Sequence, residues 1–237
     1  MLPNPRFARS SCRCRAFTLI EMLIILVVVG VLAGIILPSL NKARLKARAV
    51  ACVDQFRDLG TVFSCYSTDF EKVGKESIPA ADRKKSAWED TLKKYAKGQG
   101  GMSEQLKSKK FWQCPDCRQG HHGVGYNHFL GELGSVTRVR KPGMTVVFGD
   151  AGMIRNPLQA DPDQWEEKKI KGDPSFGSVI FSVPASRDWK KSSRRMVNRH
   201  LGRSSVIFAD GHAGSIPVST VGFQYKVGSV HALWDSQ

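Results

Sequence analysis

The chain has few acidic residues for its content of basic ones. Among 237 residues, 21 are aspartate or glutamate and 36 are lysine or arginine, which gives a formal net charge of +15. Such a surplus favours anionic partners such as nucleic acid or lipid. The basic residues are scattered, however, and no nucleic-acid motif accompanies them. We therefore interpret them as solvated surface and expect no nucleic-acid partner.

Cysteine is too scarce for a disulfide scaffold. Small secreted domains that depend on disulfides are far denser in cysteine. The six cysteines here are spread over the chain, at positions 12, 14, 52, 65, 114 and 117. The fold must therefore rest on a buried apolar core, for which a chain of this length is sufficient.

One segment lacks charge almost entirely. Residues 17–37 contain a single ionisable side chain, Glu21. The segment has the length of about 20 residues that is needed to cross a bilayer. It is too long for an ordinary secretory signal, and no A-x-A cleavage site follows it. Four arginines precede it and four basic residues follow it, so flanking charge does not fix its orientation.

The start of this segment has a specific signature. A basic leader is followed by the letters AFTLIE, residues 16–21. This resembles the class III signal of type IV prepilins, whose core reads Gly-Phe-Thr-Leu-Ile-Glu. The resemblance implies cleavage between Ala16 and Phe17 by a prepilin peptidase, with methylation of the new Phe17 amine. It also makes Pro38 the helix-kinking proline of that family. Ala16 departs from the usual glycine.

Glu21 has a physical role in this interpretation. A carboxylate in a membrane span is costly and usually marks a function. In a bundle of such helices, Glu21 can meet the cationic amine of Phe17 on a neighbouring subunit. The low dielectric strengthens that pair and favours one packing register.

Periodicity predicts the elements that follow Pro38. Apolar residues at spacings of three and four predict a helix that reaches about residue 70 and packs on the chain's own sheet: Leu45, Ala49, Cys52, Phe56, Leu59, Phe63, Tyr66 and Phe70. Ser86 and Glu89 form a capping box that predicts a helix to about Lys97. Short apolar runs predict strands near 111–114, 135–140, 144–149, 178–183, 204–209, 213–218 and 222–227.

A second signature lies near the C-terminus. His200 is followed by nine residues and then by Asp210 and Gly211. This resembles the H-x9-DG region of prepilin-like proteins that are abundant in planctomycetes and related bacteria. From the residues alone, Asp210-Gly211 between two apolar runs predicts a hairpin turn.

The same region offers a candidate metal site. Asp150 and Asp210 each end an apolar run, and carboxylates at adjacent strand ends can converge. Together with His200 and His212 they would suit zinc or manganese better than calcium, which prefers oxygen ligands. Catalysis by a His/Asp pair with a serine at 204 or 205 is disfavoured, because no nucleophile elbow or oxyanion motif is present.

Cys114 and Cys117 form a CPDC segment with His121 and His122 close behind. This is half of a zinc-knuckle spacing, since a second CxxC is missing. A tight disulfide, a zinc site and free thiols all stay open.

The fold class that we predict is α+β and pilin-like. A long N-terminal transmembrane helix would continue into a periplasmic head of antiparallel β-sheet. The expected divisions are a basic leader, a membrane and assembly helix, its continuation with a helical head segment, and a β-rich head: 1–16, 17–40, 41–110 and 111–237.

The function that we expect is a pseudopilin-like structural subunit of a type II secretion or type IV pilus-like assembly, and not an enzyme. Its partners would be prepilin peptidase, other pseudopilin subunits and the bacterial inner membrane, which it would cross once. No cofactor is certain, and a divalent metal ion stays open. The alternative is a membrane-tethered periplasmic binding module that does not polymerise.

Overall fold

The computed structural model describes residues 18–72, 87–98, 114–117, 123–130, 133–168 and 180–236. The chain divides into two compact units, Met1–Arg44 and Leu45–Gln237. Ala16, Phe17 and the first three residues of the strand predicted near 111–114 lie outside the described residues, as do His121 and His122.

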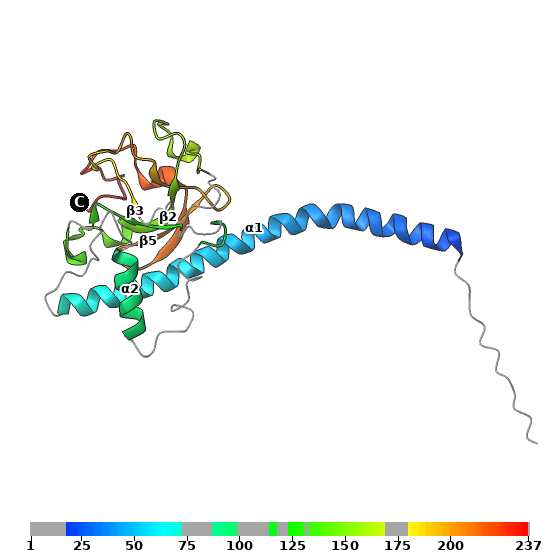
Figure 1. Cartoon of the computed structure of the whole chain (residues 1–237), viewed down its shortest axis with the longest axis horizontal. Helices are drawn as coiled ribbons and strands as arrows, with labels where there is room; N and C mark the ends of the chain where they lie inside the picture. The colour runs from blue at the N-terminus through cyan, green and yellow to red at the C-terminus, as the bar shows by residue number, and fades with distance from the viewer. Residues whose placement is uncertain are drawn as a thin grey trace, which may run out of the picture. The chain divides into compact units, whose positions relative to one another are not determined.

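Helix α1 spans Leu19–Lys72 and continues through Pro38 (Figure 1). Because Pro38 has no N–H, the carbonyl of Gly34 lacks its helical donor. In the first unit, the apolar side chains of α1 are exposed over Leu19–Leu40. Within the described residues, α1 alone is long and apolar enough to cross a membrane.

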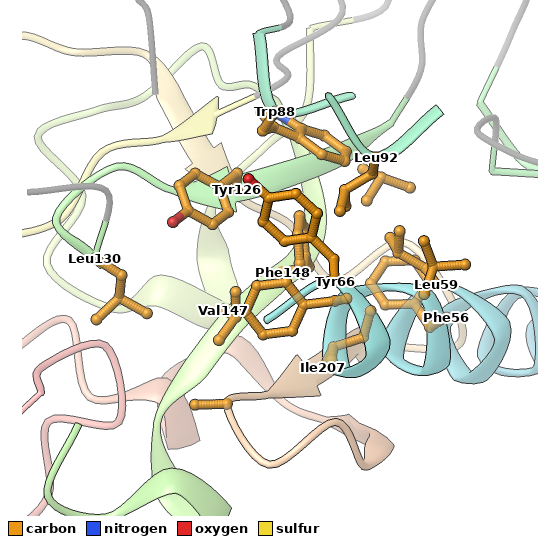
Figure 2. Packing of buried hydrophobic residues seen from close by; sticks show 14 of the residues in the cluster. Phe56, Leu59, Tyr66, Trp88, Leu92, Tyr126, Leu130, Val147, Phe148 and Ile207 are labelled. Atoms are coloured by element: carbon orange, nitrogen blue, oxygen red, sulfur yellow. The ribbon is translucent and has the colours of Figure 1, made fainter. Parts of the chain in front are cut away.

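In the second unit, α1 buries one face against the head. The aromatic and aliphatic residues that periodicity assigned to this face are buried from Cys52 to Tyr66, whereas Leu45 is exposed. Figure 2 shows Phe56, Leu59 and Tyr66 directed toward the sheet residues. The prediction that the stripe packs on the chain's own sheet is confirmed, because Phe148 and Ile207 of the sheet lie in the same cluster.

Helix α2 spans Ala87–Gly98. Trp88, Leu92 and Ala96, spaced four apart, are buried in the same cluster as the α1 face. The Trp88 ring lies 4.9 Å from that of Phe148, measured between centroids. The helix agrees with the prediction from the capping box, although Ser86 lies outside the described residues.

The described part of the head contains six strands, which are mostly antiparallel: β1 (Val124–Asn127), β2 (Val146–Met153), β3 (Ile180–Phe181), β4 (Arg194–Met196), β5 (Ser204–Phe208) and β6 (Ala213–Ile216). The order is β3-β1-β2-β5-β6, and β4 also pairs with β2. Only the β1–β3 pair is parallel among the described strands. The α+β prediction, a long N-terminal apolar helix followed by a mostly antiparallel head, is confirmed.

Strand β2 is the centre of the sheet. It pairs with β1, β4 and β5, and seven of its eight residues are buried. Val147 and Phe148 belong to the cluster with α1 and α2. Val146 and Ala151 belong to a second cluster, which includes Trp234 from the C-terminal segment. Because both faces of β2 are covered, its first three residues are all apolar, Val146, Val147 and Phe148, rather than alternately apolar and polar.

Two predicted strands are wrong. Residues 136–138 form a 3-10 helix, started by Ser135, whose side chain accepts a hydrogen bond from the Thr137 N–H. Residues 222–227 form turns, and Gly222 has a φ of +83°, which an extended strand does not allow. Strands β1 and β4 were not predicted, because neither is long nor alternating.

Candidate functional site

The N-terminal end of α1 is a capping box. The Glu21 carboxylate accepts hydrogen bonds from the Thr18 backbone N–H and from its hydroxyl, both at 2.8 Å. In return, the Thr18 hydroxyl oxygen accepts from the Glu21 N–H at 3.3 Å. This pattern satisfies donors that a helix N-terminus leaves without partners. Glu21 therefore has a local role besides any contact with a neighbouring subunit.

The Glu21–Phe17 pairing stays a prediction, since Phe17 lies outside the described residues. The capping box changes how it must be tested. Glutamine fills the same box as glutamate. A Gln substitution therefore removes the charge of Glu21 and keeps its capping function.

The H-x9-DG region consists of one strand between two turns. His200 and Arg203 exchange backbone hydrogen bonds of 2.9 and 3.0 Å around Leu201 and Gly202, whose φ values are +52° and +76°. Positive φ at both central positions is the pattern of a type I′ turn. Strand β5 follows at once, and the nine residues after His200 are this turn, β5 and Ala209.

The Asp210-Gly211 turn joins β5 to β6, so the predicted hairpin is present. The Phe208 N–H donates to the His212 carbonyl at 2.9 Å. Asp210 accepts from the His212 backbone N–H at 3.1 Å and contacts His212 Nδ1 at 2.6 Å. Gly211 has a φ of +90° and lies against Ser64 of α1, so the glycine of the motif is required by backbone conformation and by space.

The structure separates the four residues of the sequence-based metal site into two pairs. Asp150 and His200 lie together, whereas Asp210 and His212 pair with each other at the partly exposed β5–β6 turn. The cause is strand direction. β2 and β5 are antiparallel, with Gly149 opposite Val206. Asp150 therefore lies inside β2, beside the start of β5, whereas Asp210 follows the far end of β5, so their carboxylates do not converge.

Asp150 and His200 belong instead to a different buried group with Cys52 and Cys114. The ligand atoms of these four residues all lie within 4.8 Å of one another. Cys114 Sγ lies 3.2 Å from His200 Nε2 and 3.8 Å from Cys52 Sγ. Asp150 Oδ1 lies 3.7 Å from Cys52 Sγ, and its Oδ2 lies 3.7 Å from His200 Nε2. Such a group could hold a metal ion.

Separate elements bring these residues together. Cys52 comes from the buried face of α1, Asp150 from β2, and His200 from the turn before β5. Cys114 comes from a short turn in which the Cys117 N–H donates to its carbonyl at 2.9 Å. Sequence periodicity placed Cys52 on the core face but gave no reason to pair it with Cys114. A thiol on an otherwise aromatic and aliphatic stripe is the one available signal.

Charged groups surround the four residues. His200 Nδ1 contacts Asp116 Oδ2 at 3.0 Å, and Asp116 Oδ1 accepts from Arg48 of α1 at 3.2 Å. The Asp150 carboxylate accepts from Arg199 at 3.2 Å and from the Ser205 backbone N–H at 2.6 Å.

The Arg199 side chain is nearly fully buried, and all three nitrogens of its guanidinium donate hydrogen bonds. It donates to Glu167 at 2.6 Å and to the carbonyls of Gly123 and Ala151 at 2.8 and 2.9 Å. Its position beside Asp150 puts a fixed positive charge next to the four-residue group.

The pKa values in this group are displaced in opposite directions. Burial raises the pKa of Asp150 to about 6, although Arg199 opposes the rise. The hydrogen bond from Cys52 lowers the pKa of Cys114, with help from His200 and Arg199, while the same bond raises the pKa of Cys52. Burial alone would lower the pKa of His200, but Cys114, Asp150 and Asp116 reverse this and raise it. Of the two thiols, Cys114 is therefore the one whose ionised form these contacts favour.

The CPDC cysteines are free thiols in the structure, as are Cys52 and Cys65. Cys114 is directed toward Cys52 and His200, and burial raises the pKa of Cys117 to about 11. Only Cys114 of the pair belongs to the four-residue group.

The contacts from Cys114 to His200 and from His200 to Asp116 have the order of a Cys-His-Asp nucleophilic triad. Access is the difficulty, since Cys114 is only 2% exposed. A cavity of about 390 Å³ in the described part of the head is lined by other residues: Pro184, Trp189, Phe223, Gln224, Tyr225, Lys226 and Val227. The geometry suits a buried ligand set better than a nucleophile.

Comparison with known proteins finds one family model. Residues 11–37 match the prokaryotic N-terminal methylation motif. No curated protein and no solved structure matches the chain. The matched residues contain the AFTLIE signature, the Thr18–Glu21 capping box and most of the exposed apolar part of α1. The match supports a prepilin-like signal, the kind that prepilin peptidase processes.

Proposed function

We propose that the chain is a pseudopilin-like structural subunit of a type II secretion or type IV pilus-like assembly. Prepilin peptidase removes residues 1–16 and methylates Phe17. The mature subunit crosses the bacterial inner membrane once and holds its head in the periplasm. Its partners are other subunits of the same kind.

The methylation motif at residues 11–37 is the observation that carries this proposal. A plain membrane tether needs only an apolar helix of sufficient length. This chain adds a carboxylate at the fifth residue after the proposed cleavage point and a small residue before it. Exposed apolar residues over Leu19–Leu40 give the helix a surface for lipid or for other helices.

The proposed function is not enzymatic. The His/Asp/thiol arrangement of the head is the one feature that favours an enzyme. A nucleophile must reach its substrate, and Cys114 and His200 are 2% and 3% exposed. H-x9-DG contributes turns to the fold in this account, through His200–Arg203 and Asp210–Gly211.

A membrane-tethered binding module that does not polymerise is the alternative. The buried Cys52, Cys114, Asp150 and His200 group favours it to the extent that it could bind a metal. A module that exchanges a ligand needs an open site, however, and all four residues are buried.

Mass spectrometry of the mature N-terminus tests the processing step. We expect a chain of 221 residues, the 237 less the leader of 16, that starts with N-methylated Phe17. Loss of four arginines with the leader lowers the formal net charge from +15 to +11. Replacing Ala16 by Gly restores the usual residue and should accelerate cleavage. An intact N-terminus in cells with an active prepilin peptidase would contradict the proposal.

A further inference from the structure

We propose that Cys52, Cys114, Asp150 and His200 form a structural zinc site that fastens the buried half of α1 to the sheet. The proposal concerns the head alone and does not depend on polymerisation. All four residues lie in the compact unit Leu45–Gln237.

The donor set selects the metal. Two thiolates, one imidazole and one carboxylate are ligands that zinc accepts in four-coordinate sites. Calcium and magnesium prefer oxygen donors, and only Asp150 supplies them here. All four residues are at most 3% exposed, which fits a closed structural site rather than a catalytic one with an open position.

The charges balance when zinc is present. Two thiolates and the Asp150 carboxylate carry three formal negative charges. Zn²⁺ and the buried Arg199 guanidinium, which contacts Asp150 at 3.2 Å and is shared with the partly exposed Glu167, carry three positive ones. Buried charges are tolerated when they are paired or bind metal. Without the ion, Arg199 offsets the Asp150 carboxylate, and no group among the four residues offsets a second thiolate.

The surrounding hydrogen bonds orient the ligands as metal sites require. A histidine that binds zinc through one ring nitrogen usually donates its other N–H to a carboxylate. His200 directs Nε2 to the four-residue group and contacts Asp116 through Nδ1 at 3.0 Å. The Ser205 backbone N–H and Arg199 hold the Asp150 carboxylate.

The site lies where several elements of the head meet. Cys52 is one helical turn after Arg48, and both contact the CPDC turn of the chain, through Cys114 and Asp116. Zinc at this point links α1, the CPDC turn, β2 and the turn before β5. These elements are far apart in sequence, so one ion cross-links most of the head.

A disulfide between Cys52 and Cys114 is the competing state, since their sulfur atoms are 3.8 Å apart. It would remove two of the four ligands. Asp150 and His200 do not help a disulfide, whereas both serve a metal. The convergence of all four side chains therefore favours the ion.

The experiment uses the full chain, purified in mild detergent with Cys12 and Cys14 replaced by Ser, so that leader thiols do not bind metal. After mild reduction and exposure to Zn²⁺, elemental mass spectrometry should find one zinc ion per chain. Replacing zinc with Co²⁺ should give an intense thiolate-to-cobalt charge-transfer band. The thermal unfolding midpoint should fall when a chelator removes the metal and recover on reloading.

Matched variants locate the ligands. Cys52→Ser and Cys114→Ser should lose the bound metal. Cys117→Ser, in the same CPDC turn, and Cys65→Ser, on the same helix, should keep it. Asp116→Asn should keep the site and weaken its affinity about 10- to 100-fold.

Three results would overturn the proposal. They are a reduced wild-type chain without stoichiometric metal, bound Co²⁺ without a thiolate band, and a loss of metal in Cys117→Ser as large as in Cys114→Ser. A stable Cys52–Cys114 disulfide in protein isolated from its native membrane, together with absence of metal, would also overturn it. Because the cobalt band is read on the wild type, the test stands even where a variant fails to fold.

Discussion

The backbone conformation of residue 211 and its contact with α1 explain why the H-x9-DG pattern ends in glycine. Its φ is +90°, which costs about 1–2 kcal/mol for a residue with a Cβ. A Cβ at this position would also overlap the Ser64 hydroxyl of α1. Position 211 therefore cannot carry a side chain, because α1 passes directly against the turn.

Replacing Gly211 by Ala should destabilise the head by about 2–4 kcal/mol, from backbone strain together with overpacking. Gly202→Ala is the matched control, because its φ is +76° but a Cβ there would meet nothing within 4 Å. The control should cost about 1–2 kcal/mol. Thermal unfolding followed by near-UV circular dichroism of the buried tryptophans would measure both. Equal losses would show that the contact with Ser64 is unimportant.

Single residues also show what the sequence could predict. His200 and Asp150 were singled out as candidate ligands, and they do lie together. Asp210 and His212 were grouped with them because each Asp was expected to end a strand, but Asp150 lies inside β2 and Asp210 follows the far end of the antiparallel β5. Cys52 was not predicted as a site residue, since helix periodicity explains a buried thiol without any partner. Its pairing with Cys114 depends on long-range packing, which no local pattern contains.

Helix α1 and the β5–β6 turn approach each other so closely that a glycine lies on each side of the contact, Gly60 and Gly211. A Cβ on Gly60 would overlap the Gly211 carbonyl oxygen and touch Ile207. The close approach lets Phe63 of α1 pack edge-on against Phe148 of β2, with ring centroids 5.5 Å apart.

Gly60→Ala should therefore destabilise the head by about 1–3 kcal/mol. Helix propensity alone predicts the opposite, a gain of about 1 kcal/mol for Ala over Gly. Gly30→Ala, in the same helix with nothing within 4 Å of the new methyl group, should leave head unfolding unchanged. Denaturant unfolding of the full chain in detergent would compare the two. A Gly60→Ala variant as stable as wild type would refute the close-packing explanation.

Asp163 connects its own 3-10 helix, Pro162–Gln164, with Asn198 and with the 3-10 helix Val218–Val221. Its carboxylate accepts from the Ser219 hydroxyl at 2.5 Å, the Ser219 N–H at 2.9 Å and Asn198 at 2.7 Å. Burial acts to raise the pKa of Asp163, but these hydrogen bonds outweigh it and hold the pKa below its ordinary value. The ionised form of Asp163 is therefore favoured more strongly in the folded protein than in the unfolded chain.

A carboxylate with a lowered pKa stabilises the fold above its unfolded pKa of about 3.9, and the contribution is lost as the pH falls through the folded value. Asp163→Asn should cost about 1 kcal/mol at pH 7, a small figure because the site is partly solvated. The difference between variant and wild type should shrink below about pH 4. Unfolding midpoints measured from pH 7 to pH 3 would show this. A gap that stays constant over that range would argue against the ionised Asp163.

Element prediction succeeded where a pattern was long. Helix α1 was expected to reach about residue 70 and ends at Lys72, because a buried stripe repeated over several turns fixes its period. β5 and β6 were found from apolar runs around the Asp210-Gly211 turn. The short strands β1 and β4 depend on pairing with β2, so local sequence says little about them.

At the scale of the whole molecule, the α+β class followed from the sequence, as did the apolar N-terminal helix. The helix face against the sheet is set by the stripe from Cys52 to Tyr66. Sheet order was not predictable, because β3-β1-β2-β5-β6 is not the order of the strands in the chain. The methylation motif at residues 11–37 links this architecture to a prepilin-like signal.

Assembly of the chain through Glu21 can be tested by crosslinking between neighbouring subunits in the membrane. Wild type, Glu21→Gln and Thr18→Ala would be expressed at equal levels. Glu21→Gln keeps the capping box with Thr18 and removes the charge, whereas Thr18→Ala removes the two hydrogen bonds of the Thr18 hydroxyl and keeps the charge.

The account predicts crosslinked ladders in wild type and Thr18→Ala and their loss in Glu21→Gln. The expected cost of removing the charge is about 1–3 kcal/mol per subunit contact, by analogy with charge-assisted hydrogen bonds. Ladders in Glu21→Gln as strong as in wild type would contradict the charge-pairing account. Absence of ladders in wild type would contradict assembly itself and favour the tethered module.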